Sequence, residues 1–167
     1  TRYIVFAANR KYALTWLDDL RHPATLQSTQ RGSVMAKSVE VSQYMQHKPV
    51  TVMADMNIYD ASRKILENKV SGVVVVDADN NLVGMLSELD CLRALITSVY
   101  NGADPGGALV SEIMTTEVEV NQPTDDIVTV ATSMLDHKHR RRPIVVDGKL
   151  VGQLTCRQIL GAIKDFN

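Results

Sequence analysis

The residues best placed to do chemistry lie in one short segment, Gly84-Met85-Leu86-Ser87-Glu88-Leu89-Asp90. Ser87 is expected to begin a helix, with Asp90 one turn into it, and Gly84 would let the strand before it approach a ligand closely. The Asp90 carboxylate accepts hydrogen bonds at two oxygens, which suits the two donors of a cis-diol. Ser-x-x-Asp before a helix is also close to a capping box, and both roles can hold together.

A second candidate is the basic run His137-Lys138-His139-Arg140-Arg141-Arg142-Pro143. Cations near the end of a helix suit its dipole, so a solvated cluster is one interpretation. A nucleic-acid patch is another, but the net charge of the chain is only −1, which makes nucleic acid an unfavoured partner.

The second half of the chain repeats the first motif as Gly152-Gln153-Leu154-Thr155-Cys156-Arg157-Gln158. Thr155 and Gln158 keep the capping pattern, so a helix should begin here too. An amide has one acceptor oxygen and no charge, so Gln158 should hold a diol more weakly than Asp90.

These segments belong to a longer duplication. Val41-Ser-Gln-Tyr-Met45 returns as Val110-Ser-Glu-Ile-Met114, and Val73-Val-Val-Val-Asp77 returns as Pro143-Ile-Val-Val-Asp147. Two copies of one unit usually pair about a pseudo-twofold axis, and the crevice between them is a natural ligand site.

Each copy predicts the order β-α-β-β-α, which makes the fold class α+β. The expected strands lie at 50–52, 72–76 and 82–87, and at 118–120, 143–146 and 150–155. The closing helices are expected at 88–99 and 156–165. The first helix of each copy should bury one apolar face: Ile58, Ala61, Ile65 and Leu66, then Ile127, Val130, Met134 and Leu135. Asp55 and Thr124 are the expected caps of these two helices.

The domain boundaries follow from this pattern. An N-terminal arm and linker, 1–40, lies outside the duplication and should hold a short helix near 11–21. The copies span 41–100 and 110–167, with a turn-rich connector at 101–109. The arm is either flexible or packs on a partner subunit.

The duplicated unit resembles the CBS domain, of which two in tandem form a Bateman module. The resemblance rests on Val-x-x-x-Met, an apolar strand ending in Val-Asp, and Leu-Val-Gly followed by Ser or Thr, in that order and twice over. It implies two repeats packed about a pseudo-twofold axis, frequent dimers, and adenosine ligands in the clefts.

The resemblance also implies site residues. The segment from Gly84 through Met85 and Ser87 to Asp90 matches the family's ribose-binding pattern at every specified position. Basic residues before the Pro-Val-Val strand often meet ligand phosphates, which maps onto His139, Arg141 and Arg142. Thr155 marks the second motif, where Gln153 and Gln158 depart from the pattern and put an equivalent site in doubt.

The sequence gives little support for a catalytic function, because it contains no phosphate loop, nucleophile elbow or zinc-protease motif. His137 and His139 are poorly spaced for a metal site, so no metal is expected. Two distant cysteines and no apolar stretch of membrane-spanning length indicate a cytoplasmic protein with no membrane association.

We therefore predict a non-catalytic regulatory module that senses AMP, ADP or ATP in the cleft between its repeats. It would form a homodimer and act on an effector protein. The alternatives are a ligand-independent dimerisation or interaction module and a sensor of S-adenosylmethionine.

Overall fold

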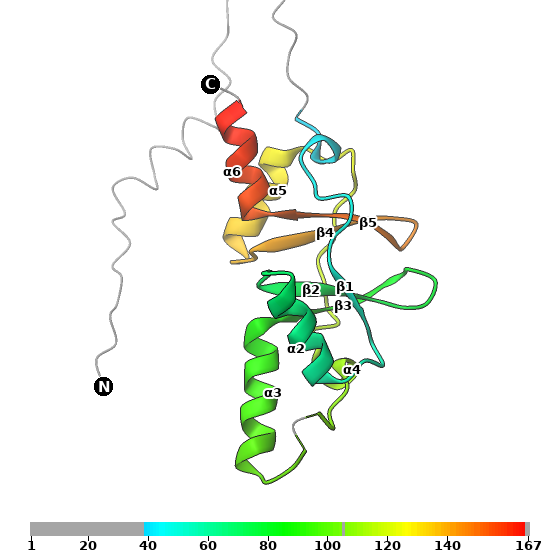
Figure 1. Cartoon of the computed structure of the whole chain (residues 1–167). Coiled ribbons are helices and arrows are strands. Elements are labelled where there is room, and N and C mark those ends of the chain that lie inside the picture. Colours follow the sequence, from blue (N-terminus) through cyan, green and yellow to red (C-terminus); the bar gives the residue numbers. More distant parts are fainter. Residues whose placement is uncertain (1–38, 105, 166–167) are drawn as a thin grey trace, which may run out of the picture. The chain divides into compact units, whose positions relative to one another are not determined.

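Two related sets of helices and strands follow one another along the chain (Figure 1). The computed structural model describes residues 39–104 and 106–165, so the helix expected near 11–21 lies outside the described residues. The first copy contains η1 (Val41–Gln43), β1 (Thr51–Met53), α2 (Ile58–Glu67), β2 (Gly72–Val76), β3 (Leu82–Ser87) and α3 (Glu88–Tyr100). The second contains α4 (Val110–Ile113), α5 (Ile127–Asp136), β4 (Arg141–Val146), β5 (Lys149–Thr155) and α6 (Cys156–Asp165).

The two copies differ in their sheets. In the first, β1 pairs parallel to β2, which pairs antiparallel to β3. In the second, β4 and β5 form a hairpin, and the strand expected at 118–120 is absent. Only a single bridge between Asn121 and Ile144 remains there. Pro143 explains the difference. The observed registers of the two hairpins make Val74 its counterpart, one residue from the Val73 that the sequence repeat aligns with it; Val74 donates its N–H to Val50, whereas proline has no N–H to donate.

The helices bury the predicted faces with two exceptions. Every expected position of α2 and α5 is buried except Leu66 and Leu135, which are exposed. Each follows a buried residue, Ile65 or Met134, and is therefore turned about 100° away from the core.

The predicted caps of these helices were wrong by two residues. Asn57 accepts from the N–H of Asp60 at 2.8 Å, and Asp126 accepts from that of Thr129 at 2.8 Å. These residues cap α2 and α5 in place of Asp55 and Thr124, because the cap must stand three residues before the N–H that it binds.

The short helix that begins each copy packs on the other copy (Figure 1). Val41 is buried in the core of the second copy and donates its N–H to Asp125, 2.9 Å away. Val110 is buried in the core of the first copy and donates to Met56 at 2.8 Å. The copies therefore exchange their first turns, and neither completes its core alone.

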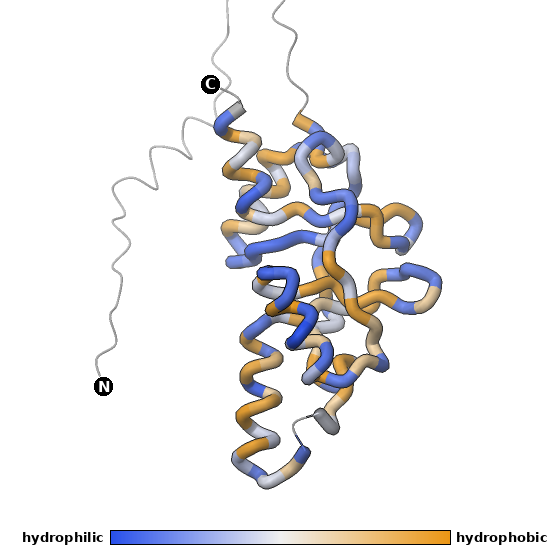
Figure 2. Tube along the Cα trace, viewed as in Figure 1, coloured by the Kyte–Doolittle hydropathy of each residue, from blue (hydrophilic) through white to orange (hydrophobic). Residues whose placement is uncertain are grey.

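The copies also meet through their sheets. Val74 and Val76 of β2 pack with Leu150 of β5. Figure 2 shows this part of β2 as an apolar stretch of the chain. At the hairpin tips, Leu82 donates to Gly148 at 3.0 Å and Leu150 donates to Asn80 at 3.0 Å. A shared apolar layer and paired tips thus fix one hairpin against the other.

Candidate functional site

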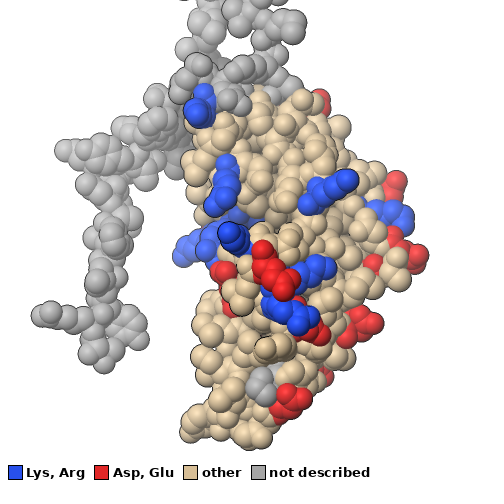
Figure 3. Space-filling view, in the orientation of Figure 1, with Lys and Arg blue, Asp and Glu red and all other residues tan. Residues whose placement is uncertain are grey.

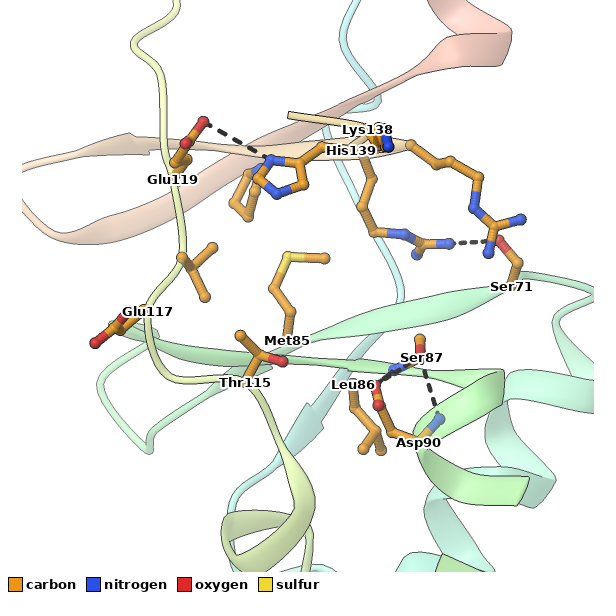
Figure 4. Close-up of a pocket in the computed structure, with 14 residues that line it drawn as sticks. Ser71, Met85, Leu86, Ser87, Asp90, Thr115, Glu117, Glu119, Lys138 and His139 are labelled. Carbon is orange, nitrogen blue, oxygen red and sulfur yellow. Dashed lines mark hydrogen bonds and ion pairs between the residues drawn. The ribbon is translucent and has the colours of Figure 1, made fainter. Parts of the chain in front are cut away.

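A cavity of about 370 Å³ lies where the two copies meet (Figure 4). Its walls come from β3 and the start of α3, from the segment 115–119 that crosses between copies, and from the chain leading into β4. A cavity of this size is sufficient for a small organic ligand. Met85 points into it from β3, and Asp90 stands at its edge.

Ser87 and Asp90 form the capping box that the sequence indicates. The Ser87 hydroxyl donates to Asp90 Oδ2 at 2.6 Å and its N–H donates to the same oxygen at 2.9 Å. The Asp90 N–H donates to Ser87 Oγ at 3.3 Å. Among the described residues, Asp90 Oδ1 accepts no hydrogen bond, so one carboxylate oxygen remains for a ligand.

Arg141 reaches the same cavity from the second copy. Its Nη2 donates to Ser71 Oγ at 2.6 Å, and its Nη1 donates to the carbonyl oxygen of Gly72. Burial, together with the neighbouring Arg140, lowers the pKa of its guanidinium, while Glu88 opposes this. Arginine stays charged at neutral pH, so Arg141 places a fixed positive charge at this wall.

Arg142 lies elsewhere, although the sequence indicates it as a ligand contact. It is 3% exposed and does not line the cavity. Its Nη1 pairs with Glu119, and its Nη2 donates to Ser133 Oγ at 3.1 Å. His139 does line the cavity, with its Nδ1 3.7 Å from a Glu119 oxygen.

Gly84 and Thr155 also stand apart from this cavity. A Cβ on Gly84 would lie 2.6 Å from Met114 Sδ, so the glycine accommodates the exchanged first turn of the other copy and not a ligand. Thr155 lines a second cavity, where its N–H donates to Gln158 Oε1 at 3.0 Å. Of the predicted site residues, the structure brings together Met85, Ser87, Asp90, His139 and Arg141.

The sequence analysis missed several lining residues. Ser71, Thr115, Glu117 and Glu119 complete the polar wall, together with Lys138 and Arg140 of the basic run. Ser71 could have been found, because it precedes the predicted strand 72–76 in the place that the basic run holds before the predicted strand 143–146. No sequence pattern indicates that residues 115–119 line the cavity, because their position depends on the exchange of first turns between the copies.

Comparison with known proteins decides the family. The model of the CBS domain matches residues 41–97 and 110–165, which is more than half of the chain. The chain belongs to the CBS-domain family. Its two copies are tandem CBS repeats, packed about a pseudo-twofold axis.

Relatives of known sequence and structure agree with this assignment. MJ1225 of Methanocaldococcus jannaschii is 27% identical over 83% of the chain, and the chain spans 49% of its length. CBSX2, a CBS-pair protein of Arabidopsis thaliana, is similar in structure. Its complex with AMP gives a TM-score of 0.69 and 28% identity, over 77% of this chain and 98% of that one.

A further neighbour extends the fold comparison. The CBS pair of MJ0100, in complex with 5′-methylthioadenosine and S-adenosyl-L-methionine, gives a TM-score of 0.66 at 22% identity. It covers 77% of this chain and 98% of its own, and shows the likeness of fold. Within the described residues, no helix has the length and apolar character needed to cross a bilayer.

Proposed function

We propose that this CBS pair is a non-catalytic regulatory module that binds AMP, ADP or ATP in the first cavity, lined by Asp90 and Arg141. The proposal rests on one observation: an unpartnered carboxylate oxygen of Asp90 and the half-buried guanidinium of Arg141 line one cavity of about 370 Å³. The two groups match the two polar parts of a nucleotide.

The ribose would lie at Asp90. Its Oδ2 is engaged in the capping box, and its Oδ1 is the acceptor that a cis-diol needs. The capping box holds the carboxylate in place before the ligand arrives, so little conformational entropy is lost on binding.

The phosphate would lie toward Arg141, whose planar fork can donate to phosphate oxygens while retaining a bond to Ser71. Lys138 and Arg140 add positive charge to the same wall. Met85, Val118 and Pro143 supply apolar surface against which a base could pack. The structure of CBSX2 with AMP supports this ligand class for a protein of the same fold.

S-adenosylmethionine is the alternative ligand of the same site. It shares the ribose, so Asp90 would serve it equally. Its sulfonium is a cation, and the Arg141 side of the cavity would repel it. Glu117 and Glu119, also in the wall, are the groups that would favour it.

A ligand between the repeats would bias their arrangement, because it contacts both. We propose that a homodimer transmits this change to an effector protein. The ligand-independent interaction module is the competing function, and it predicts no ligand at all. Both cysteines of the described region are free, which fits the reducing environment of the cytoplasm that we propose.

A panel of AMP, ADP, ATP, adenosine and S-adenosylmethionine, measured by thermal unfolding and calorimetry, tests the proposal. We expect AMP, ADP or ATP to bind more tightly than adenosine. Absence of binding by every member would favour the interaction module. If S-adenosylmethionine binds most tightly, the site does not select its ligand by a phosphate, although the proposed contact between Asp90 and the ribose would still hold.

A further inference from the structure

A second cavity, of about 440 Å³, lies on the other side of Arg141. It is bounded by the end of α2 in the first repeat and by the start of α6 in the second. Ser71, Arg140 and Arg141 line both cavities. The two sites are therefore neighbours that share one cationic wall.

The charge of this second cavity differs from that of the first. Four cations line it, Lys69, Arg140, Arg141 and Arg157, and no lining residue is a carboxylate. The first cavity balances its cations with three carboxylates, Asp90, Glu117 and Glu119. Figure 3 shows Lys and Arg side chains gathered where the two repeats meet.

These cations are not neutralised by the fold. Across residues 39–104 and 106–165, Lys69, Arg140 and Arg157 make no ion pair. α6 begins at Cys156, so the positive end of its dipole lies at the same wall. Like charges held together in a concave site create a strong positive potential, which an anion would relieve.

A buried polar group points to a ligand independently of these charges. Gln153 lines the cavity, is 5% exposed, and within the described region its Oε1 has no hydrogen-bond partner. Its counterpart in the first repeat is Met85, an apolar side chain. Rotation of the amide presents either an acceptor or a donor, so Gln153 can bind a phosphate hydroxyl or a phosphate oxygen.

The second cavity lacks the carboxylate that offers a ribose an acceptor in the first cavity. Gln158 stands where Asp90 stands in the first repeat, and its single oxygen already accepts from the N–H and hydroxyl of Thr155. No oxygen of Gln158 is left unpartnered for a diol. Positive charge and the unpartnered Gln153 amide are therefore the features of this cavity that favour an anion.

We infer that the second cavity binds linked phosphate groups, as in a polyphosphate anion, without recognising a nucleoside. Two or more phosphates are needed to engage cations on opposite walls, Lys69 and Arg157, together with the shared Arg141. The phosphates have two sources: a free polyphosphate, or the tail of a nucleotide whose ribose lies at Asp90. Binding of a free polyphosphate involves the second cavity alone, whereas the nucleotide-tail source rests on the proposed function, because Asp90 lines only the first cavity.

The test is calorimetry with tripolyphosphate on the wild type and on the double variant Lys69→Asn/Arg157→Gln. Both residues are exposed and line only the second cavity. Asparagine suits position 69 because the backbone there is left-handed, with φ of 53°. We expect the wild type to bind and the double variant to lose at least about tenfold in affinity.

A matched control removes the same charge elsewhere. Arg93→Gln/Lys164→Gln changes two exposed cations that line neither cavity, and Asp90→Asn alters only the first. Tripolyphosphate should bind both controls as it binds the wild type. Three results would overturn the inference: an equal loss of tripolyphosphate affinity in Arg93→Gln/Lys164→Gln, a loss of that affinity in Asp90→Asn, or no binding of tripolyphosphate by the wild type.

ATP and AMP separate the two sources. If the double variant weakens ATP but not AMP, the phosphates are those of a nucleotide tail. If it weakens tripolyphosphate alone, the cavity holds a free polyanion. If it weakens neither tripolyphosphate nor ATP, the inference is wrong, whatever adenosine and AMP do at Asp90.

Discussion

Arg141 donates a hydrogen bond to the hydroxyl oxygen of Ser71, 2.6 Å away, and so joins the second CBS repeat to the first. The bond crosses the seam between the repeats, at the wall that both cavities share. A ligand phosphate at this wall would engage a side chain that already links the repeats, which makes Arg141 the residue through which binding can alter their arrangement.

Replacing Arg141 should separate phosphate recognition from ribose recognition. Arg141→Gln removes a charge-assisted donor worth about 1.5–3 kcal/mol, so AMP affinity should fall about ten- to a hundredfold while adenosine binding stays unchanged. Calorimetry with both ligands measures this.

Arg142→Gln is the control for Arg141. Arg142 is buried and paired with Glu119, so its replacement should cost about 1–3 kcal/mol of folding free energy and leave the preference for AMP over adenosine intact. The assignment fails if Arg142→Gln abolishes that preference and Arg141→Gln does not.

Asp77 should make the first hairpin sensitive to acid. Its Oδ1 accepts from the N–H groups of Asn81 and Asp79, at 2.8 and 3.0 Å, and its Oδ2 accepts from the Asn81 side chain at 2.8 Å. The Asn81 hydrogen bonds lower the pKa of the Asp77 carboxyl. A lowered folded-state pKa stabilises the fold above the unfolded-state pKa, and this contribution is lost as pH falls through the folded-state pKa.

The Asp77→Asn variant should therefore have a lower free energy of unfolding than the wild type at neutral pH. The difference should shrink as the pH falls below about 4. Urea unfolding at pH 7 and pH 3 measures the difference. A stability difference that is the same at both pH values would show that the Asp77 charge has no part in the hairpin.

The two cysteines should differ in reactivity. Burial raises the pKa of the Cys91 thiol, with a smaller contribution from nearby acidic residues, so Cys91 should be inert in the native state. Cys156 is exposed and should react first. Mass spectrometry after brief alkylation should find the label on Cys156, and on Cys91 only after unfolding. Labelling of both at similar rates would contradict the packing of α3.

Apolar residues on α3 should mediate dimerisation. Leu89, Leu92, Ile96 and Val99 are exposed and recur every three or four residues, so they form one stripe along the helix. Figure 2 shows apolar residues repeating along α3. We expect a dimer in sedimentation experiments, and a folded monomer for Leu92→Lys/Ile96→Lys, with a circular dichroism spectrum like that of the wild type.

Leu66→Lys is the matched control for the dimer, because Leu66 is an exposed leucine on α2. It should leave the dimer intact. A monomeric wild type at micromolar concentration, with and without AMP, would rule out this use of the α3 stripe.

Much of the fold could be predicted from residue patterns. The apolar pattern gives β2, β3, α3, β5 and α6 within one residue of their observed bounds, because turn or capping residues bound each apolar run or periodic segment. Leu95 is harder to place from the sequence: it stands beside the exposed Ile96 in α3, yet it packs against the core of the first repeat.

The site was harder to predict, for two physical reasons. The exchange of first turns leaves no trace in a duplicated sequence, because Val41 and Val110 fit either core equally well. The strand β4 begins at Arg141, two residues earlier than expected, so neighbouring side chains alternate between its faces. Arg141 therefore faces the cavities, while Arg142 turns to Glu119.

Asp90 is the residue that we propose to hold the ribose of an adenosine nucleotide. The most direct measurement is AMP binding by calorimetry to the wild type, Asp90→Asn and Gln158→Ala. Asparagine can keep the cap but presents an amide donor where Oδ1 was an acceptor, so the tighter AMP site should weaken about ten- to a hundredfold. Gln158→Ala should leave that affinity unchanged. Equal losses from both changes, or no loss from either, would contradict the account.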